Sequence, residues 1–296
     1  MISDRVAGAP ISWGVCEVPG WGRRLAPGRV LAEMRELGLV ATEFGPEGFL
    51  PDDPADRTAL LARHGLRPVG GFVPVVLHDP AHDPLPEVTA ALTAFGADEM
   101  ERSTFGLVLV LAAATGLDGY DERPLLDATG WVTLLANLDR IAGHAADAGV
   151  RAVLHPHVGT MVERAEEVRR VLDGAAIGLC LDSGHLLLGG TDPVELAARH
   201  AGRIAHVHLK DVDTALADRF RCGELTYTEA VRAGLYRPLG KGDVDVAGLV
   251  RSLEAAGYDG WYVLEQDTVL TGDPAPGTGP LDDVRACLDF LAGIDA

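Results

Sequence analysis

The sequence contains no apolar run long enough to cross a membrane. A transmembrane helix needs about 20 such residues, and the longest stretch, 105–114, is much shorter. Residues 1–14 show no basic segment followed by an apolar one, so we expect no signal peptide, a cytoplasmic location and no membrane partner. The four cysteines are far apart and form no Cys-x-x-Cys pair. This spacing argues against a disulfide framework or a zinc knuckle and is typical of reduced thiols.

Positive charge is also scarce. The chain has 25 Lys and Arg residues against 44 Asp and Glu residues, a formal net charge of -19. Because so acidic a surface repels phosphate backbones, we expect no nucleic-acid partner. A glycine-rich phosphate loop is missing too, since Ser12-Trp-Gly-Val-Cys16 stands where a doubly wound dinucleotide-binding sheet would carry one.

The chain does contain a regular alternation of apolar, β-prone runs and amphipathic runs. The expected strands are residues 6–13, 40–44, 68–73, 107–111, 152–155, 177–181, 204–209 and 261–264. The expected helices are residues 28–37, 55–64, 86–101, 125–148, 162–172, 193–200, 246–256 and 281–291. Four of these helices are followed by a glycine that can end them, namely Gly38, Gly65, Gly149 and Gly257. This order predicts parallel strands joined by crossover helices, most simply an α/β fold closed into a (β/α)8 TIM barrel.

We expect a single domain over residues 1–296, because barrels of this length commonly form one domain. A long connection at about 211–243 follows the seventh strand and would lie over the C-terminal mouth of the barrel. Long loops at that position are often lids or substrate clamps. A contact in a homo-oligomer is the alternative with equal weight.

Polar residues gather at the carboxyl ends of the expected strands, where TIM barrels carry their chemistry. The strand ends in question contain Glu43, His155-Pro-His157, Asp182-Ser-Gly-His185, His206-Val-His-Leu-Lys-Asp211 and Glu265-Gln-Asp267. The amino ends of the same strands show nothing comparable.

Strand alternation sharpens this pattern, because side chains two residues apart share a face. One consistent inward assignment brings together a four-residue cluster: His155, Asp182, His208 and Glu265. Two imidazoles and two carboxylates suit a divalent metal ion. Manganese or cobalt is the first expectation, with zinc or iron as alternatives. Taken singly, each histidine could be a hydrogen-bonded core residue, Glu265 an ion-pair partner and Asp182 a helix cap. Four successive strands ending in such residues favour the metal site.

Six stretches carry a resemblance to a known family. They are Ala9-Pro-Ile-Ser-Trp-Gly-Val-Cys-Glu17, Thr42-Glu-Phe-Gly-Pro-Glu-Gly48, His155-Pro-His-Val-Gly-Thr160, Leu181-Asp-Ser-Gly-His185, His206-Val-His-Leu-Lys-Asp211 and Leu264-Glu-Gln-Asp267. Together they resemble the sugar isomerase/epimerase-type (xylose isomerase-like) barrels, and within them the inosose dehydratases, from the first strand to the eighth. The resemblance implies a metal-dependent hydro-lyase of inositol catabolism that converts 2-keto-myo-inositol into a trihydroxycyclohexane-1,2-dione. It also implies a small polyhydroxylated ketone as substrate and a glutathione requirement, for which no residues can be named.

The ketose epimerases of this superfamily hold their metal through Glu, Asp, His and Glu. Here Asp182, His208 and Glu265 match that pattern, whereas His155 replaces the first glutamate. The replacement disfavours a symmetric epimerisation by two carboxylates and favours one-sided abstraction of an α proton followed by elimination. His185 matches a histidine that contacts substrate in those relatives.

The chemistry assigns further roles. Glu265 or Glu43 is the expected base, and His157, His185 or Lys210 the expected acid, unless Lys210 only pairs with Asp211. The expected substrate contacts are Trp13, Glu43, His157, His185, His206 and Lys210. Trp13 could equally be barrel packing.

Three alternatives stay open on the same scaffold. A ketose isomerase or epimerase would share the metal and the proton abstraction. An apurinic-site endonuclease would need a basic groove, which the net charge disfavours. A non-catalytic sugar-binding protein would need no metal.

Overall fold

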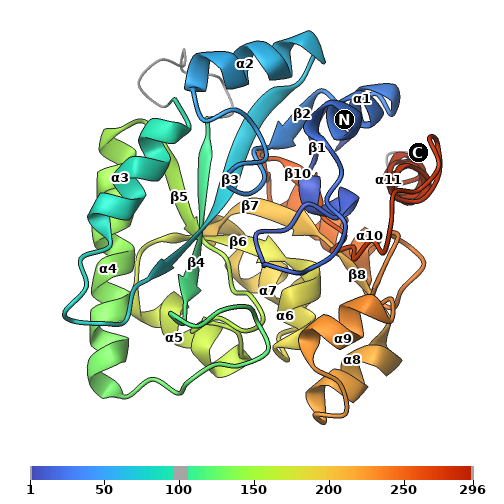
Figure 1. Cartoon of the computed structure of the whole chain (residues 1–296). Helices are drawn as coiled ribbons and strands as arrows, with labels where there is room; N and C mark the ends of the chain where they lie inside the picture. The colour runs from blue at the N-terminus through green and yellow to red at the C-terminus, as the bar shows by residue number, and fades with distance from the viewer. Residues whose placement is uncertain (1, 97–105, 295–296) are drawn as a thin grey trace.

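Eight parallel strands close into a barrel in the computed structural model, which describes residues 2–96 and 106–294 (Figure 1). Around the barrel the strands follow the order of the chain, β1-β2-β3-β4-β5-β6-β7-β10. Their bounds are β1 Val6–Gly8, β2 Ala41–Glu43, β3 Arg67–Val76, β4 Val108–Ala114, β5 Arg151–Leu154, β6 Gly178–Asp182, β7 Ile204–Leu209 and β10 Tyr262–Leu264. The predicted (β/α)8 fold is therefore confirmed.

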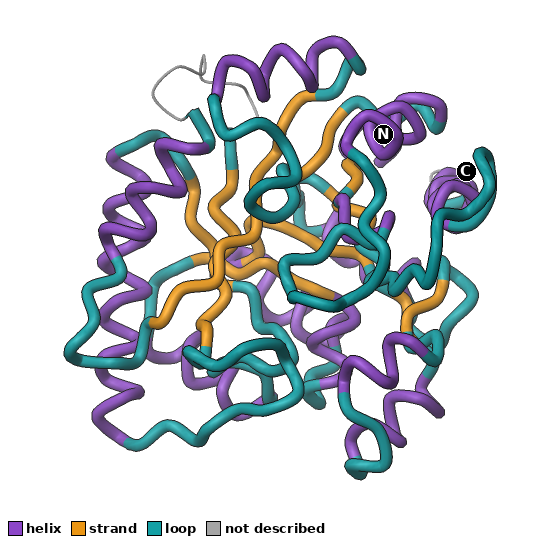
Figure 2. Tube along the Cα trace, in the orientation of Figure 1, coloured by secondary structure: helices purple, strands orange, loops and turns teal. Residues whose placement is uncertain are grey.

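Helices surround the strands on the outside of the barrel (Figure 2). They are α1 Pro27–Glu36, α2 Pro54–Arg63, α3 Leu85–Ala94, α4 Ala128–Asp147, α5 Ala165–Gly174, α6 Ser183–Leu188, α7 Pro193–His200, α8 Thr214–Arg221, α9 Tyr227–Arg232, α10 Val246–Ala255 and α11 Pro280–Ala292. Gly38, Gly65, Gly149 and Gly257 all have positive φ angles, between 68° and 81°, as the predicted helix ends require. Within residues 2–96 and 106–294, no helix is both long and apolar enough to cross a membrane.

Two expected elements differ most from the observed bounds. The first strand ends at Gly8 instead of residue 13, and Pro10–Trp13 forms a 3-10 helix. Pro10 cannot donate a ladder hydrogen bond, and Gly14 closes the turn with φ 75°, so the chain leaves the barrel early. The helix expected over 86–101 is observed as α3, which ends at Ala94, so Phe95 and Gly96 were wrongly expected to be helical. The part of that prediction from residue 97 on lies outside the described residues.

The connection after β7 contains helices and strands of its own. It contains α8, α9 and an antiparallel pair of short strands, β8 Asp211–Val212 and β9 Tyr236–Arg237. Asp211 is fully buried and accepts backbone N–H groups from Gly240 at 2.8 Å, Gly242 at 2.9 Å and Val244 at 3.0 Å. A Cβ atom at Gly242 would lie 2.4 Å from the Asp211 carboxylate, so glycine is required there. Asp211 thus fastens the end of this connection to the barrel.

Loss of the hydrogen bonds to the Asp211 carboxylate is expected to destabilise the protein. Asp211→Ala leaves four backbone N–H donors, those of Val212, Gly240, Gly242 and Val244, without their charged acceptor, and we expect the free energy of unfolding to fall by about 3 kcal/mol. Urea unfolding followed by circular dichroism measures this loss. Asp243→Ala is the matched control, because Asp243 caps Thr214 in the same connection but is exposed. Equal losses in both variants would contradict the role given to Asp211.

Candidate active site

A cavity of about 620 Å³ opens at the carboxyl ends of the barrel strands. This volume falls within the range of about 300–1,000 Å³ that is usual for small-molecule sites. Polar lining residues include Glu43, His155, His157, Lys210, Glu265 and Asp267, and aromatic ones include Trp21, Phe72, Tyr120 and Tyr227. The cavity can therefore hold a compact polar molecule against partly aromatic walls.

The four-residue cluster proposed from the sequence comes together at the base of this cavity. Nε2 of His155 lies 3.3 Å from Oδ2 of Asp182. Nδ1 of His208 lies 2.8 Å from Oε2 of Glu265 and 3.7 Å from Oδ2 of Asp182. All four side chains are buried, and they come from the ends of four neighbouring strands, β5, β6, β7 and β10.

The donor atoms of this cluster fit a divalent cation. Both ring nitrogens of His155 and Nδ1 of His208 are buried and make no well-formed hydrogen bond to the described residues. Buried polar atoms of this kind are usually satisfied, so unpartnered imidazole nitrogens facing carboxylate oxygens point to a ligand. Two nitrogens and two carboxylates are ligands that zinc, manganese, cobalt and iron accept.

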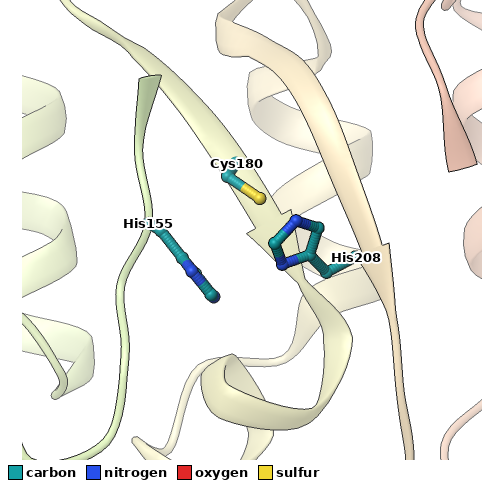
Figure 3. Close-up of side chains that lie close together, drawn as sticks. All are labelled: His155, Cys180 and His208. Carbon is teal, nitrogen blue, oxygen red and sulfur yellow. The ribbon is translucent and has the colours of Figure 1, made fainter. Parts of the chain in front are cut away.

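A buried thiol lies close to the imidazoles of His155 and His208. Figure 3 shows Cys180 on β6 pointing to the space between His155 and His208, which approach it from β5 and β7. Burial raises the pKa of the Cys180 thiol to about 11, so it is protonated at neutral pH. Because strand alternation places Cys180 one layer deeper than Asp182, the carboxylates are nearer to the cavity than the sulfur.

Glu43 holds the orientation of His208. One oxygen, Oε1, lies 2.8 Å from Nε2 of His206 and 2.9 Å from Nε2 of His208. Since a carboxylate accepts hydrogen bonds, both Nε2 atoms carry a proton, and Nδ1 is the ring nitrogen of His208 that faces Asp182 and Glu265. Burial by itself would raise the pKa of Glu43, but the two histidines outweigh it and hold that pKa far below its usual range. Glu43 therefore acts on the cluster through His208.

The metal affinity of a Glu43 variant tests whether Glu43 orients His208 for metal binding. Glu43→Gln keeps the size of the side chain but removes its charge, and loss of such a supporting partner typically lowers metal affinity by about 10–100-fold. Competition with a coloured chelator measures the Kd for Mn²⁺. Glu33→Gln is the control, because Glu33 is also buried and also accepts a ring N–H, from Trp13 at 2.8 Å, away from the cavity. Identical affinities in Glu43→Gln and the wild type would refute this role.

Lys210 is buried among carboxylates instead of pairing with Asp211. Its Nζ atom lies 3.0 Å from Oδ2 of Asp182 and 3.1 Å from Oδ1 of Asp267, and it contacts Oε2 of Glu265. Burial lowers the pKa of Lys210, but these three carboxylates raise it well above its usual value. Burial likewise raises the pKa of Glu265, but His208 and Lys210 lower it to about 2. The site thus holds a charged ammonium beside ionised carboxylates.

His157 and His185 form a stacked pair beside the cluster. Their ring centroids are 3.8 Å apart, and only His157 is among the cavity-lining residues. Nδ1 of His157 donates to the carbonyl of Val158 at 2.7 Å, so Nε2 carries the lone pair. Burial, together with the charges of His155 and Lys210, lowers the pKa of His157 to about 3. A neutral His157 accepts hydrogen bonds at Nε2, which makes it a poor proton donor, and His185 lies behind it.

Several residues of the site were not proposed from the sequence. Asp267 lines the cavity, and its Oδ2 accepts the hydroxyl of Tyr227 at 2.6 Å. Burial raises the pKa of Asp267 to about 6, against the opposing effect of Lys210. Tyr236, from β9, lies 3.1 Å from Tyr227, hydroxyl to hydroxyl. Asp267 could have been found by alternation, since it stands two residues after Glu265, but nothing local indicates the two tyrosines.

Two expected substrate contacts lie elsewhere. Trp13 is fully buried and donates from its indole nitrogen to Glu33 on α1, so it packs between the barrel and that helix. His206 lies one layer deeper than His208, because successive inward-facing residues of a strand are two positions apart. Its Nε2 atom binds Glu43. Neither is among the residues that line the cavity.

Comparison with known proteins agrees with this architecture. A family model of the xylose isomerase-like TIM barrel matches residues 31–291. The inosose dehydratase of Geobacillus kaustophilus (strain HTA426) is 32% identical over 280 residues, which cover 92% of this chain and 88% of that protein. The rhizopine catabolism protein MocC of Rhizobium meliloti is 34% identical over 276 residues, which cover 90% of this chain and 82% of that protein.

Solved structures share the fold. A crystal structure of the IOLI protein with a bound zinc atom superposes with a TM-score of 0.66 at 15% identity, covering 98% of this chain and 97% of that one. At this level of identity the likeness concerns the fold alone.

Proposed function

This chain belongs to the xylose isomerase-like TIM-barrel family, and from that premise we propose that it is a metal-dependent dehydratase of a cyclic polyhydroxylated ketone, 2-keto-myo-inositol. The observation that carries the proposal is the cluster of two imidazoles and two carboxylates at the base of a cavity sized for such a ring. The similarity to inosose dehydratases over most of the chain supports the reaction class and a place in inositol catabolism.

His155, Asp182, His208 and Glu265 would hold the metal. A divalent ion there supplies Lewis acidity toward the ketone and a neighbouring hydroxyl. Manganese or cobalt is the ion we propose, because two of the four ligands are carboxylates and the thiol of Cys180 lies one layer deeper than Asp182. The zinc atom of the IOLI structure belongs to that protein.

The residues that line the cavity divide the proton transfers between them. Glu265, whose ionised carboxylate lines the cavity, removes the proton next to the ketone. Lys210, the charged donor in the same wall, protonates the leaving β-hydroxyl, which departs as water. His157 accepts a hydrogen bond from a substrate hydroxyl at Nε2, and His185 supports it from behind. The enol that remains tautomerises to the 1,2-dione.

A dehydration assay tests this function. The protein is stripped of metal, reloaded with Mn²⁺ or Co²⁺ and mixed with 2-keto-myo-inositol, and the ultraviolet absorbance of the enolised dione is followed. We expect absorbance to grow only in the metal-loaded sample. Stoichiometric metal binding without absorbance growth would refute the dehydratase and favour the second candidate, a ketose isomerase or epimerase, which begins with the same proton abstraction.

A further inference from the structure

The two carboxylate oxygens that face the imidazoles are also the oxygens that Lys210 contacts. Oδ2 of Asp182 lies 3.3 Å from Nε2 of His155 and 3.0 Å from Nζ of Lys210. Oε2 of Glu265 lies 2.8 Å from Nδ1 of His208 and also contacts Nζ of Lys210. A divalent ion held by these ligands would therefore use the same carboxylate lone pairs as the ammonium of Lys210.

Only one carboxylate oxygen of Asp182 is available to a cation. Its other oxygen, Oδ1, accepts the backbone N–H groups of Gly184 at 2.9 Å and His185 at 2.8 Å, which caps α6. Capping hydrogen bonds of this kind fix a carboxylate in place. Only Oδ2 remains for a positive charge, so Lys210 and a divalent ion compete for one atom. Two positive charges so close together also repel strongly in a buried site.

Lys210 has a third carboxylate partner, which is outside the four-residue cluster. Its Nζ atom lies 3.1 Å from Oδ1 of Asp267. Oδ2 of Asp267 accepts the hydroxyl of Tyr227 at 2.6 Å, and Tyr227 comes from the connection after β7. This connection therefore holds in place a carboxylate that can retain Lys210 when the other two carboxylates are engaged.

We propose that Lys210 is an internal cation that competes with the divalent ion for Asp182 and Glu265, and that Asp267, held by Tyr227, retains Lys210 when the ion binds. The inference rests on the metal site of the proposed function. It implies that the ion pair of Lys210 with Asp267, and the hydrogen bond of Tyr227 to Asp267, affect metal affinity. A lysine that only supported the ligands would have the opposite effect, because its removal would weaken binding.

Calorimetric titration of the metal-stripped full-length protein with Mn²⁺ tests the inference. Lys210→Met removes the competing charge and is expected to lower the Kd at least tenfold. Asp267→Asn removes the charge that retains Lys210 and is expected to raise the Kd about tenfold. Tyr227→Phe loses only the hydroxyl and is expected to raise the Kd by a smaller factor, about threefold.

The outcomes separate this inference from the proposed function. An unchanged or higher Kd in Lys210→Met overturns the competition while leaving the metal site intact. Absence of Mn²⁺ binding in the wild type and in every variant overturns both. Lys210→Met leaves three carboxylates to repel one another, which opposes folding without metal. If that variant does not fold, an unchanged Kd in both Asp267→Asn and Tyr227→Phe overturns the inference, and a raised Kd in both supports it.

Discussion

Replacement of Glu265 by glutamine is expected to lower kcat for dehydration by about 10³-fold, within the range attributed to a positioned general base. The amide keeps the shape of the side chain but cannot accept the α proton, and it also loses the charge that faces His208 and Lys210. The initial rate of dione absorbance at saturating Mn²⁺ and substrate measures the effect. Saturation with metal separates the loss of the base from weakened metal binding.

Glu254→Gln is the matched control for this prediction. Glu254 also lies in an ion pair, 2.5 Å from Arg5, and accepts the hydroxyl of Tyr262 at 2.7 Å, but it stands on α10 outside the barrel and does not line the cavity. We expect the kcat of the Glu254→Gln variant to stay within about twofold of the wild-type value, as for substitutions distant from reacting groups. Retention of more than a tenth of the activity by Glu265→Gln would place the base on another residue.

Replacement of Asp182 by alanine is expected to have the largest effect on stability. Asp182 is fully buried, accepts two backbone N–H groups and pairs with Lys210. Its removal leaves an ammonium with fewer counter-charges in the interior, and breaking a buried pair typically costs about 3–5 kcal/mol. The measurement is urea unfolding in the presence of a chelator, so that metal binding does not contribute to the difference.

A second aspartate provides the control. Asp192 caps α7 with the same pattern, accepting N–H groups from Val194 at 2.8 Å and Glu195 at 3.1 Å, but it is exposed. Loss of an exposed cap costs about 1 kcal/mol. The difference between Asp182→Ala and Asp192→Ala therefore isolates burial and the contact with Lys210. If both variants lose the same free energy, Asp182 acts only as a helix cap.

Much of the fold could be predicted from the sequence because its signals are local. The alternation of β-prone and amphipathic runs and the glycines at helix ends depend only on neighbouring residues. The bounds were less accurate where a local exception intervened, as at Pro10, which ends the first strand early. The register shift between Thr42 and Glu43 is another feature that no sequence pattern indicated.

The convergence of the four-residue cluster was predictable for the same reason. A strand alternates its faces with a period of two, and all parallel strands of a barrel end at one mouth, so periodicity alone places His155, Asp182 and His208 on one side. Alternation does not give depth, however. It therefore placed His206 with His208 at the substrate, whereas His206 lies one layer below and binds Glu43.

The sequence by itself determined the barrel, the mouth that carries the chemistry and the residues that meet there, because each follows from short-range periodicity. Only the tertiary structure decided which of those residues face the cavity, which support others and which segments complete the site. Tyr227 reaches Asp267 through the packing of a connection that lies 40 residues away along the chain. Lys210 contacts three carboxylates from two other strand ends. Contacts of this kind depend on how distant segments pack, which no local pattern records.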